Sequence, residues 1–305
     1  MAVIGIDLGT TNSLACTWKN SRPLIIRNSL GSEITPSVAG VDDNNNIVVG
    51  EVAKERLITN PENTASEFKR SLGTKRSYQV GPNNFSPEQL SSLVLKKIKE
   101  DAEAFLGEEV TEAIISVPAY FDDCRRNATK QAAEMSGLKV ERLINEPSAA
   151  ALAYMQKHGF EDGTYMVIDF GGGTLDVSMI DSFDSIMEIL AVAGNNQLGG
   201  KDFNDAIYSH FLTECKLNGD QLTPEQKASI YKTAEACKIA LSDAPVSIMS
   251  VNINDKNYSL LLKELDISSQ DIIIPSVLYI KEGQLYSSIN IQSEEELNIF
   301  IENIK

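Results

Sequence analysis

The sequence predicts an α/β fold made of two lobes, each led by the same kind of hairpin. Short apolar strands alternate with amphipathic helices along the chain, and this alternation is typical of α/β proteins. A strand that ends in aspartate and turns through small residues occurs twice, at Asp7 and again at Asp169. The chain has 305 residues, of which 42% are hydrophobic, so it is long enough for two lobes with cores of their own.

The first hairpin occupies the start of the chain. Residues 2–7 form a short β-branched run that is ended by a turn at residues 9–12, and residues 13–18 are again rich in apolar side chains. This pattern predicts two strands joined by a tight turn. Residues 38–50 contain two strand-like segments around an Asp/Asn-rich turn, which predicts another hairpin with a solvated tip.

The middle of the chain alternates between helix and strand signals. A capping box from Ser86 to Gln89 predicts a helix over about 87–106. Residues 113–117 are typical of a buried strand, and residues 125–136 are Ala-rich and favour a helix.

The hairpin design returns at residues 165–180. An apolar strand ends in Asp169, a glycine turn follows at residues 171–174, and the next strand is expected over residues 175–180. Because the two hairpins share strand, aspartate and small-residue turn, we expect two lobes with related starts. The predicted lobes are residues 1–160 and 161–262, and residues 263–305 form a divergent tail.

The last third of the chain carries one strong helix signal. A second capping box begins at Thr223 and predicts a helix to about Ser242. Within the tail, residues 272–291 are expected to form two strands around Glu282-Gly283, and residues 293–304 a short amphipathic helix.

The charge balance narrows the classes of partner. Lys and Arg total 27 against 43 Asp and Glu, which gives a formal net charge of −16. Such a chain repels a phosphate backbone, so nucleic acid is not an expected partner. Backbone amides, a lysine or a metal ion can bind an anion locally in spite of the negative net charge. The net charge is therefore weaker evidence against a nucleotide ligand than against nucleic acid.

Neither the cysteines nor the apolar runs indicate a metal, disulfide or membrane role. The four cysteines, Cys16, Cys124, Cys215 and Cys237, form no CxxC pair and lie near no histidine in the sequence. Four reduced thiols in the core are therefore expected. The chain has no run of about 18 apolar residues and its N-terminus lacks a signal-peptide pattern. We expect a cytoplasmic protein that does not enter a membrane.

The two aspartate turns suggest a site for an oligophosphate. A turn through glycine and threonine presents several backbone N–H groups and hydroxyls in one concave patch. Asp7 and Asp169 suit a hydrated Mg²⁺, whose waters they would hold. An ordinary glycine turn explains either hairpin alone, but it predicts no matching aspartate. NNQLGGKD (195–202) lacks the first glycine and the final Ser/Thr of a P-loop, and no GxGxxG opens a helix.

Six segments in order resemble the nucleotide-binding domain of the heat-shock-protein-70 chaperones of the DnaK type. They are IGIDLGTTNS (4–13), FKRSLG (68–73), ISVPAYF (115–121), LINEPSAAALAY (143–154), VIDFGGGTLDVS (167–178) and LGGKDF (198–203). FKRSLG and the segment 91–106 make the chain most similar to the HscC branch. The resemblance implies an actin-like (ribonuclease H-like) ATPase fold, with two lobes around a cleft for ATP or ADP and Mg²⁺.

The resemblance also implies roles for individual residues. The phosphates would be bound by Gly9, Thr10, Thr11, Asn12, Gly171, Gly172, Gly173, Thr174, Gly199 and Gly200. Asp7 and Asp169 would hold the hydrated magnesium, with Glu146 linked to it through water. The implied catalytic residues are Lys69, Glu146, Asp169 and Thr174. Pro118 and Arg126 would act with Glu146 in signalling the nucleotide state.

One helix face is expected to bind adenosine. Glu235, Lys238 and Ser242 match the family's residues and are spaced by three and four, which places them on one side of the helix. Ile239 stands where many members stack an arginine on the base. An apolar residue packs on the ring but offers no cation, so weaker adenine binding is expected.

The resemblance ends near residue 260. The family's second glycine-rich adenosine loop, interdomain linker and peptide-binding domain have no counterpart in residues 263–305, so we expect a truncated or modified second lobe. A sheet edge and an apolar face would then lie open unless strands of the tail cover them.

Two functions from different classes fit these patterns. The first is an ATP-binding, slowly hydrolysing domain of a DnaK/HscC-like chaperone, an ATPase that has a co-chaperone or nucleotide-exchange factor as a partner. The second is a non-catalytic interaction protein that retains the ATPase fold, because half of the adenosine pocket is missing. Sugar kinases and filament proteins share the fold, but LINEPSAAALAY argues against both.

Overall fold

The computed structural model describes residues 2–159, 161–184, 186–195 and 197–263, and the backbone of 276–281 and 284–288. These residues form a mixed α/β protein with several sheets. The chain divides into two compact units, which alternate along the sequence. Unit 1 contains residues 1–117, 121–143 and 201–269, and unit 2 contains residues 118–120, 144–200 and 270–305. The boundaries of the two lobes stay a prediction.

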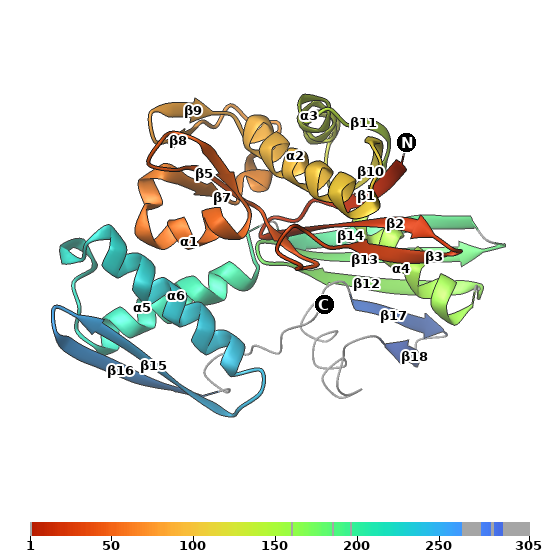
Figure 1. The fold of residues 1–305 in the computed structure, drawn as a ribbon. Coiled ribbons are helices and arrows are strands. Elements are labelled where there is room, and N and C mark those ends of the chain that lie inside the picture. Colours follow the sequence, from red (N-terminus) through yellow and green to blue (C-terminus); the bar gives the residue numbers. More distant parts are fainter. Residues whose placement is uncertain are drawn as a thin grey trace. The chain divides into compact units, whose positions relative to one another are not determined.

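A six-stranded sheet lies at the centre of unit 1 (Figure 1). Its strands follow the order β11 (Lys139–Asn145), β10 (Val110–Val117), β1 (Ala2–Asp7), β2 (Asn12–Lys19) and β3 (Arg22–Ile26), and β4 (Thr35–Pro36) also pairs with β2. β1 runs parallel to β10 and antiparallel to β2, which confirms the first predicted hairpin.

Two helices pack beside this sheet. α2 (Pro87–Leu106) begins at the predicted capping box, in which both the Ser86 and the Gln89 hydrogen bonds are present, and α3 (Asp123–Met135) contacts it. Ile4 and Ile6 of β1 and Val94 and Leu95 of α2 are almost fully buried in one hydrophobic cluster. Burial of alternate residues fixes the register of β1, and each such side chain contributes about 1.5–3 kcal/mol.

Smaller elements complete this part of unit 1. They are β5 (Val38–Val41), β6 (Ile47–Val49), α1 (Glu51–Thr59), η1 (Pro61–Asn63), β7 (Thr64–Ser66), η2 (Phe68–Ser71), β8 (Tyr78–Val80) and β9 (Asn83–Phe85). The antiparallel pairing of β5 with β6 confirms the hairpin predicted within residues 38–50.

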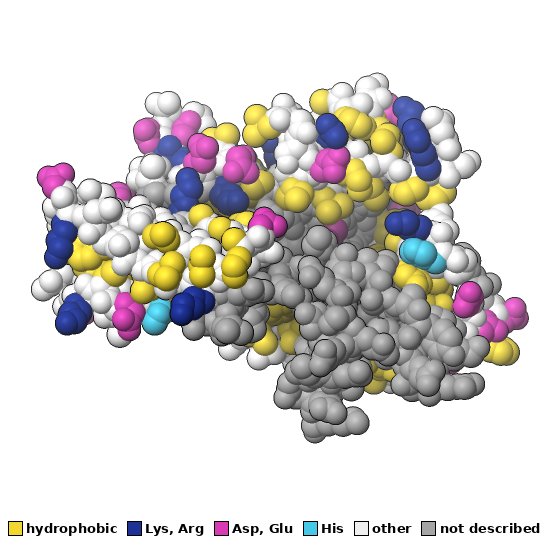
Figure 2. All heavy atoms as spheres, turned by 90° about the horizontal axis from the view of Figure 1, so that it is seen from below, with side chains coloured by type: hydrophobic (Ala, Val, Ile, Leu, Met, Phe, Trp, Pro, Cys, Tyr) yellow, Lys and Arg dark blue, Asp and Glu magenta, His cyan; other side chains and the backbone are white. Residues whose placement is uncertain are grey.

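A second cluster of unit 1 is built on two helices and a hairpin. Its elements are α5 (Gly200–Glu214), η3 (Gly219–Gln221), α6 (Pro224–Ala240), β15 (Val246–Ile253) and β16 (Lys256–Lys263). Phe211 and Ile230 of the helices pack with Met249 and Leu262 of the hairpin. The other face of the hairpin exposes apolar side chains, seen as the yellow patch over β15 and β16 in Figure 2; Val246, Ile248 and Leu261 belong to it.

Unit 2 contains a five-stranded antiparallel sheet. The order is β14 (Ile186–Asn195), β13 (Leu175–Phe183), β12 (Gly163–Phe170), β17 (Ser276–Lys281) and β18 (Gln284–Ser288). α4 (Glu146–His158) packs on β12 and β13, and its Met155 shares a core with Tyr165 and Ile180.

The tail contributes to this sheet. β17 pairs antiparallel with β12, so a strand of the tail covers this edge of the sheet. β17 and β18 also confirm the two strands predicted around Glu282-Gly283. The helix expected over residues 293–304 lies outside the described residues. Within the part of the chain described above, no helix combines the length and apolar character needed to cross a bilayer.

Candidate functional site

Asp7 is the last residue of β1 and lies beside the end of β10. Asp7 lies opposite Ser116 in the parallel register, and the Ser116 hydroxyl donates a 2.6 Å hydrogen bond to Asp7 Oδ1. Ser116 is buried, whereas Asp7 is exposed. The carboxylate is therefore held in direction by a buried neighbour and is still accessible to a solvated ligand.

The turn after Asp7 is shaped by buried hydroxyl groups. The Gly9 N–H donates to Ser13 Oγ (3.2 Å), and the Ser37 hydroxyl donates to the Gly9 carbonyl (2.8 Å). The Ser13 and Ser37 oxygens are 2.9 Å apart, and the Ser37 N–H donates to the Thr11 carbonyl. A Cβ at Gly9 would lie 2.0 Å from the Asn12 carbonyl oxygen, so this turn requires glycine.

Lys69 lies in η2, next to the sheet of unit 1. Only 7% of its surface is exposed, and its Nζ lies 6.0 Å from the centre of the Phe121 ring. Lysines are rarely buried to this extent unless they are paired or have a function. This burial separates Lys69 from the ordinary surface lysines of the chain.

The expected adenosine residues lie on α6 and just after it. Lys238 is buried, Glu235 is half-buried and Ser242 is exposed. The helix ends at Ala240, so Ser242 belongs to the following turn, where its N–H donates to the Ile239 carbonyl. The predicted helix end at Ser242 is thus two residues too late. The Ile239 side chain is 53% exposed.

The glycine turn of unit 2 joins β12 to β13. Asp169, half-buried near the end of β12, lies opposite Asp176 of β13 in the antiparallel register. The Gly171 N–H donates to the Thr174 carbonyl at 2.7 Å and closes the turn. Asp176 was not predicted as a site residue, although a carboxylate two residues after the glycine turn is a visible signal in the sequence. Two carboxylates opposite each other on neighbouring strands favour a cation or proton nearby.

A second glycine segment packs against this turn. The Gly200 N–H donates to the Gly171 carbonyl at 2.9 Å. A Cβ at Gly199 would lie 2.3 Å from the Gly173 nitrogen, so glycine is required for this close approach. The structure thus brings together residues 171–174 and 199–200, which belong to separate motifs. Glu146 is the first residue of α4 in the same unit.

The expected residues are divided between the units. Unit 1 contains Asp7, Gly9, Thr10, Thr11, Asn12, Lys69, Glu235, Lys238 and Ser242. Unit 2 contains Glu146, Asp169, Gly171, Gly172, Gly173, Thr174, Gly199 and Gly200. Each unit therefore carries one aspartate at or near a strand end and a position that only glycine fits, which is Gly9 within the turn of unit 1 and Gly199 packed against the turn of unit 2.

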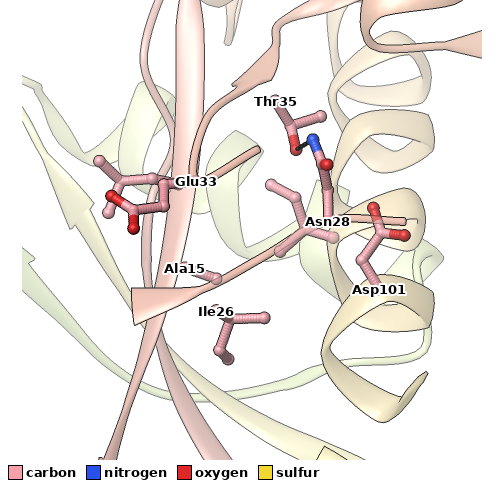
Figure 3. Close-up of a pocket in the computed structure, with 8 residues that line it drawn as sticks. Ala15, Ile26, Asn28, Glu33, Thr35 and Asp101 are labelled. Carbon is pink, nitrogen blue, oxygen red and sulfur yellow. Dashed lines mark hydrogen bonds between the residues drawn. The ribbon is translucent and has the colours of Figure 1, made fainter. Parts of the chain in front are cut away.

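A small cavity in unit 1 is distinct from these residues (Figure 3). Its volume is about 10 Å³, which is room for roughly one water. It is lined by Leu14, Ala15, Ile26, Asn28, Glu33, Thr35, Ile98 and Asp101. The Asn28 amide donates to Thr35 Oγ1 across it. The cavity is too small for a nucleotide.

The electrostatic surroundings of Asp7 affect a neighbouring thiol. Burial raises the pKa of the Cys16 thiol and the nearby Asp7 carboxylate raises it further, against the lowering effect of a hydrogen bond with the Gly5 backbone. All four cysteines are free, but only Cys237 is buried, so the expectation of core thiols is wrong for Cys16, Cys124 and Cys215. No group of three or more His, Cys, Asp or Glu side chains gathers closely enough to hold a metal within the described ranges.

A comparison with known protein families agrees with these features. The family described as Hsp70 protein matches residues 3–80 and residues 75–268. The matched stretches include both glycine turns, Lys69 and the expected adenosine residues. The chain therefore belongs to the Hsp70 family.

Proposed function

We propose that this chain is the ATP-binding, slowly ATP-hydrolysing nucleotide-binding domain of a cytoplasmic chaperone of the DnaK/HscC type. Membership of the Hsp70 family supports a chaperone nucleotide-binding domain. The observation that carries the proposal is a repeated aspartate followed by a small-residue turn, with a position that only glycine fits at Gly9 within the turn of unit 1 and at Gly199 against residues 171–174 of unit 2. Both turns would bind phosphate groups of the nucleotide, as the actin-like fold of the family implies.

The chemistry of the donor groups fits a hydrated magnesium ion. Asp7 is an exposed carboxylate held through one oxygen, and Asp169 lies opposite a second carboxylate. Mg²⁺ keeps most of its waters in proteins, so single carboxylates from different strands suit its water shell. Asp7 and Asp169 would hold this shell, with Glu146 joined to it through water. When bound, Mg²⁺ would polarise the phosphates and neutralise part of their charge.

The protein groups have distinct tasks in the proposed hydrolysis. Backbone N–H groups within residues 10–12 and 172–174 bind the phosphates, while the N–H groups of Gly9 and Gly171 hold the turns in shape. Lys69 offsets the charge that develops on the γ-phosphate. Glu146, Asp169 and the Thr174 hydroxyl orient a water molecule. The oxygen of this water forms a bond to the γ-phosphorus while the bond to the β–γ bridging oxygen breaks. The products are ADP, inorganic phosphate and a proton released to water.

We propose that the protein binds the adenosine part of the nucleotide more weakly than the phosphates. Glu235, Lys238 and Ser242 would contact the ribose and base from α6. The exposed apolar side chain of Ile239 would pack on the ring without a cation. Titration calorimetry with Mg-ATP and Mg-GTP tests this point, and a difference in affinity of less than about tenfold is expected.

Hydrolysis of radiolabelled ATP tests the catalytic role of Lys69. Lys69→Ala should lower the single-turnover rate by roughly 100-fold, because it removes the cation at the developing charge. Lys130→Ala is the matched control, since Lys130 is an exposed lysine on α3. Equal background rates for the wild type and Lys69→Ala would favour the alternative, a non-catalytic interaction protein that retains the fold and binds a co-chaperone or nucleotide-exchange factor.

A further inference from the structure

A cluster of four charged side chains connects η2, which contains Lys69 and is called the Lys69 turn below, to the first turn of α5 within unit 1. Lys201 Nζ lies 2.9 Å from Glu67 Oε1 and 3.0 Å from Oε2. Arg70 Nη1 is 3.6 Å from Glu67 Oε2, and Arg70 Nη2 is 3.6 Å from Asp202 Oδ2. All four side chains are between 21% and 37% exposed, so water screens these pairs only in part.

Glu67 has an unusual backbone conformation. Its φ of 59° and ψ of 16° lie in the left-handed region, which is uncommon for residues other than glycine. It caps η2, where the Arg70 N–H donates to the Glu67 carbonyl at 3.1 Å. Strained conformations persist when the surroundings hold them. The ion pair between Lys201 and the Glu67 carboxylate supplies such a restraint.

Both partners of this ion pair adjoin residues that are proposed to bind phosphate. Glu67 precedes Lys69 by two residues, and Lys201 directly follows the Gly199-Gly200 segment. Tyr231 of α6 adds a contact on the Lys201 side, because its hydroxyl donates to the Lys201 carbonyl at 3.5 Å. Burial and the charge of Asp205 raise the pKa of Tyr231, so this hydroxyl stays a neutral donor. The first turn of α5 is thus held by its backbone and its side chains.

We propose that Glu67 is a positioning residue for the nucleotide site: through Lys201 it fixes the Lys69 turn on α5 and thereby slows nucleotide release. This inference rests on the function proposed above. A lysine that is already in place before binding loses less conformational entropy in gripping the phosphates. Without the Glu67–Lys201 pair, the turn would relax toward an ordinary backbone conformation and Lys69 would lose its orientation.

A double-mutant cycle on the full chain tests this role. The variants are Glu67→Gln, Lys201→Met and their combination, and the readout is the dissociation rate of a ribose-labelled fluorescent ADP in the presence of Mg²⁺. Each single change should raise the rate by about two- to fivefold, as expected for a partly exposed ion pair. The combination should raise it no further than either single change, because the two residues act as one unit. High salt should shrink the difference from the wild type.

Matched controls separate positioning from general stability. Arg27 and Glu33 form an ion pair of 3.0 Å elsewhere in unit 1, and Arg27→Met and Glu33→Gln should leave the dissociation rate unchanged. Lys201→Arg, which keeps the charge, should stay within about twofold of the wild type. Thermal unfolding verifies that each variant folds.

The outcomes distinguish the two proposals. Wild-type binding of the labelled ADP, with unchanged rates or strictly additive effects in the cycle, overturns the role of Glu67 and leaves the proposed function standing. Failure of the wild type to bind labelled ADP or Mg-ATP overturns the proposed function and this inference with it. Variants that lose thermal stability without a faster release would assign the pair to the fold alone.

Discussion

The two aspartate turns have the same design in sequence but are braced in different ways. In unit 1, the buried hydroxyls of Ser13, Ser37 and Ser116 hold the turn and its aspartate. In unit 2, the turn is held by backbone hydrogen bonds and by the close packing of glycine on glycine. Hydroxyl bracing depends on single side chains, whereas glycine bracing depends on the absence of side chains.

The strands next to these turns also differ. β1 pairs with β2 on one side and with the parallel strand β10 on the other. In the sequence, β10 lies between α2 and α3. β12 has the antiparallel neighbour β17 on its second side, which comes from the tail. The first turn therefore rests beside a parallel strand and the second beside an antiparallel one, and both neighbouring strands are distant in the sequence.

Removal of the tail should have the largest effect, because it should destabilise unit 2 and leave the sheet of unit 1 intact. A chain that ends at Lys263 lacks β17 and β18, so the edge of β12 loses its partner. Exposed strand edges promote association, and we expect loss of the protected core of unit 2 and aggregation of the shortened chain. Limited proteolysis with mass spectrometry and analytical sedimentation measure this. A monomer with unit 2 still protected would show that β12 does not depend on β17.

Gly199→Ala should have the next largest effect, and it acts on unit 2. The new Cβ would meet the backbone of residues 172–173, and overpacking of this kind costs about 1–3 kcal/mol. Urea unfolding and Mg-ATP titration should both show the loss. Gly219→Ala is the control, because its Cβ meets only the end of the Leu212 side chain at 3.3 Å. Equal effects of the two changes would contradict the glycine bracing.

Ser116→Ala should have a smaller effect, and it acts on unit 1. It removes the 2.6 Å hydrogen bond to Asp7, and because that carboxylate is exposed we expect a loss near 1 kcal/mol, roughly fivefold in affinity for Mg-ATP. Calorimetric titration measures it. Ser91→Ala is the matched control, since the buried Ser91 hydroxyl has no hydrogen-bond partner among the described residues. An unchanged affinity for Ser116→Ala would mean that Asp7 needs no brace.

Alkylation of Cys16 should give the smallest signal and reports on the first hairpin. Because burial raises the pKa of Cys16, a smaller fraction of this thiol is ionised at mildly alkaline pH, and it should react more slowly than the exposed Cys124. Folding favours the protonated thiol, so its contribution to stability falls as the pH rises through the window between the ordinary and the raised pKa. Peptide mapping after iodoacetamide treatment measures both rates. Equal rates for the two cysteines would indicate that the first hairpin opens readily.

Local signals predicted the elements that carry the site. The capping boxes at Ser86 and Thr223 placed α2 and α6, because the side chains that satisfy a helix end lie within four residues of it. Short apolar, β-branched runs predicted β1 and β12, with Asp7 at the end of the first strand and Asp169 near the end of the second. α1, α5, β14 and the β15–β16 hairpin were missed, since their signals are weaker: α5 opens on Gly200, and the exposed face of β15 carries Val246 and Ile248, which hides the alternation.

The strands β1 and β12, the two capped helices, the glycine turns and the family could be predicted from the sequence, because each depends on residues that are close together in the chain. Folding of the whole chain decides which distant groups meet: Ser37 with Gly9, Ser116 with Asp7, β17 with β12, and Lys201 with Glu67. Such contacts form where packing of the whole core brings two segments together, and neither segment carries a local pattern that names its partner.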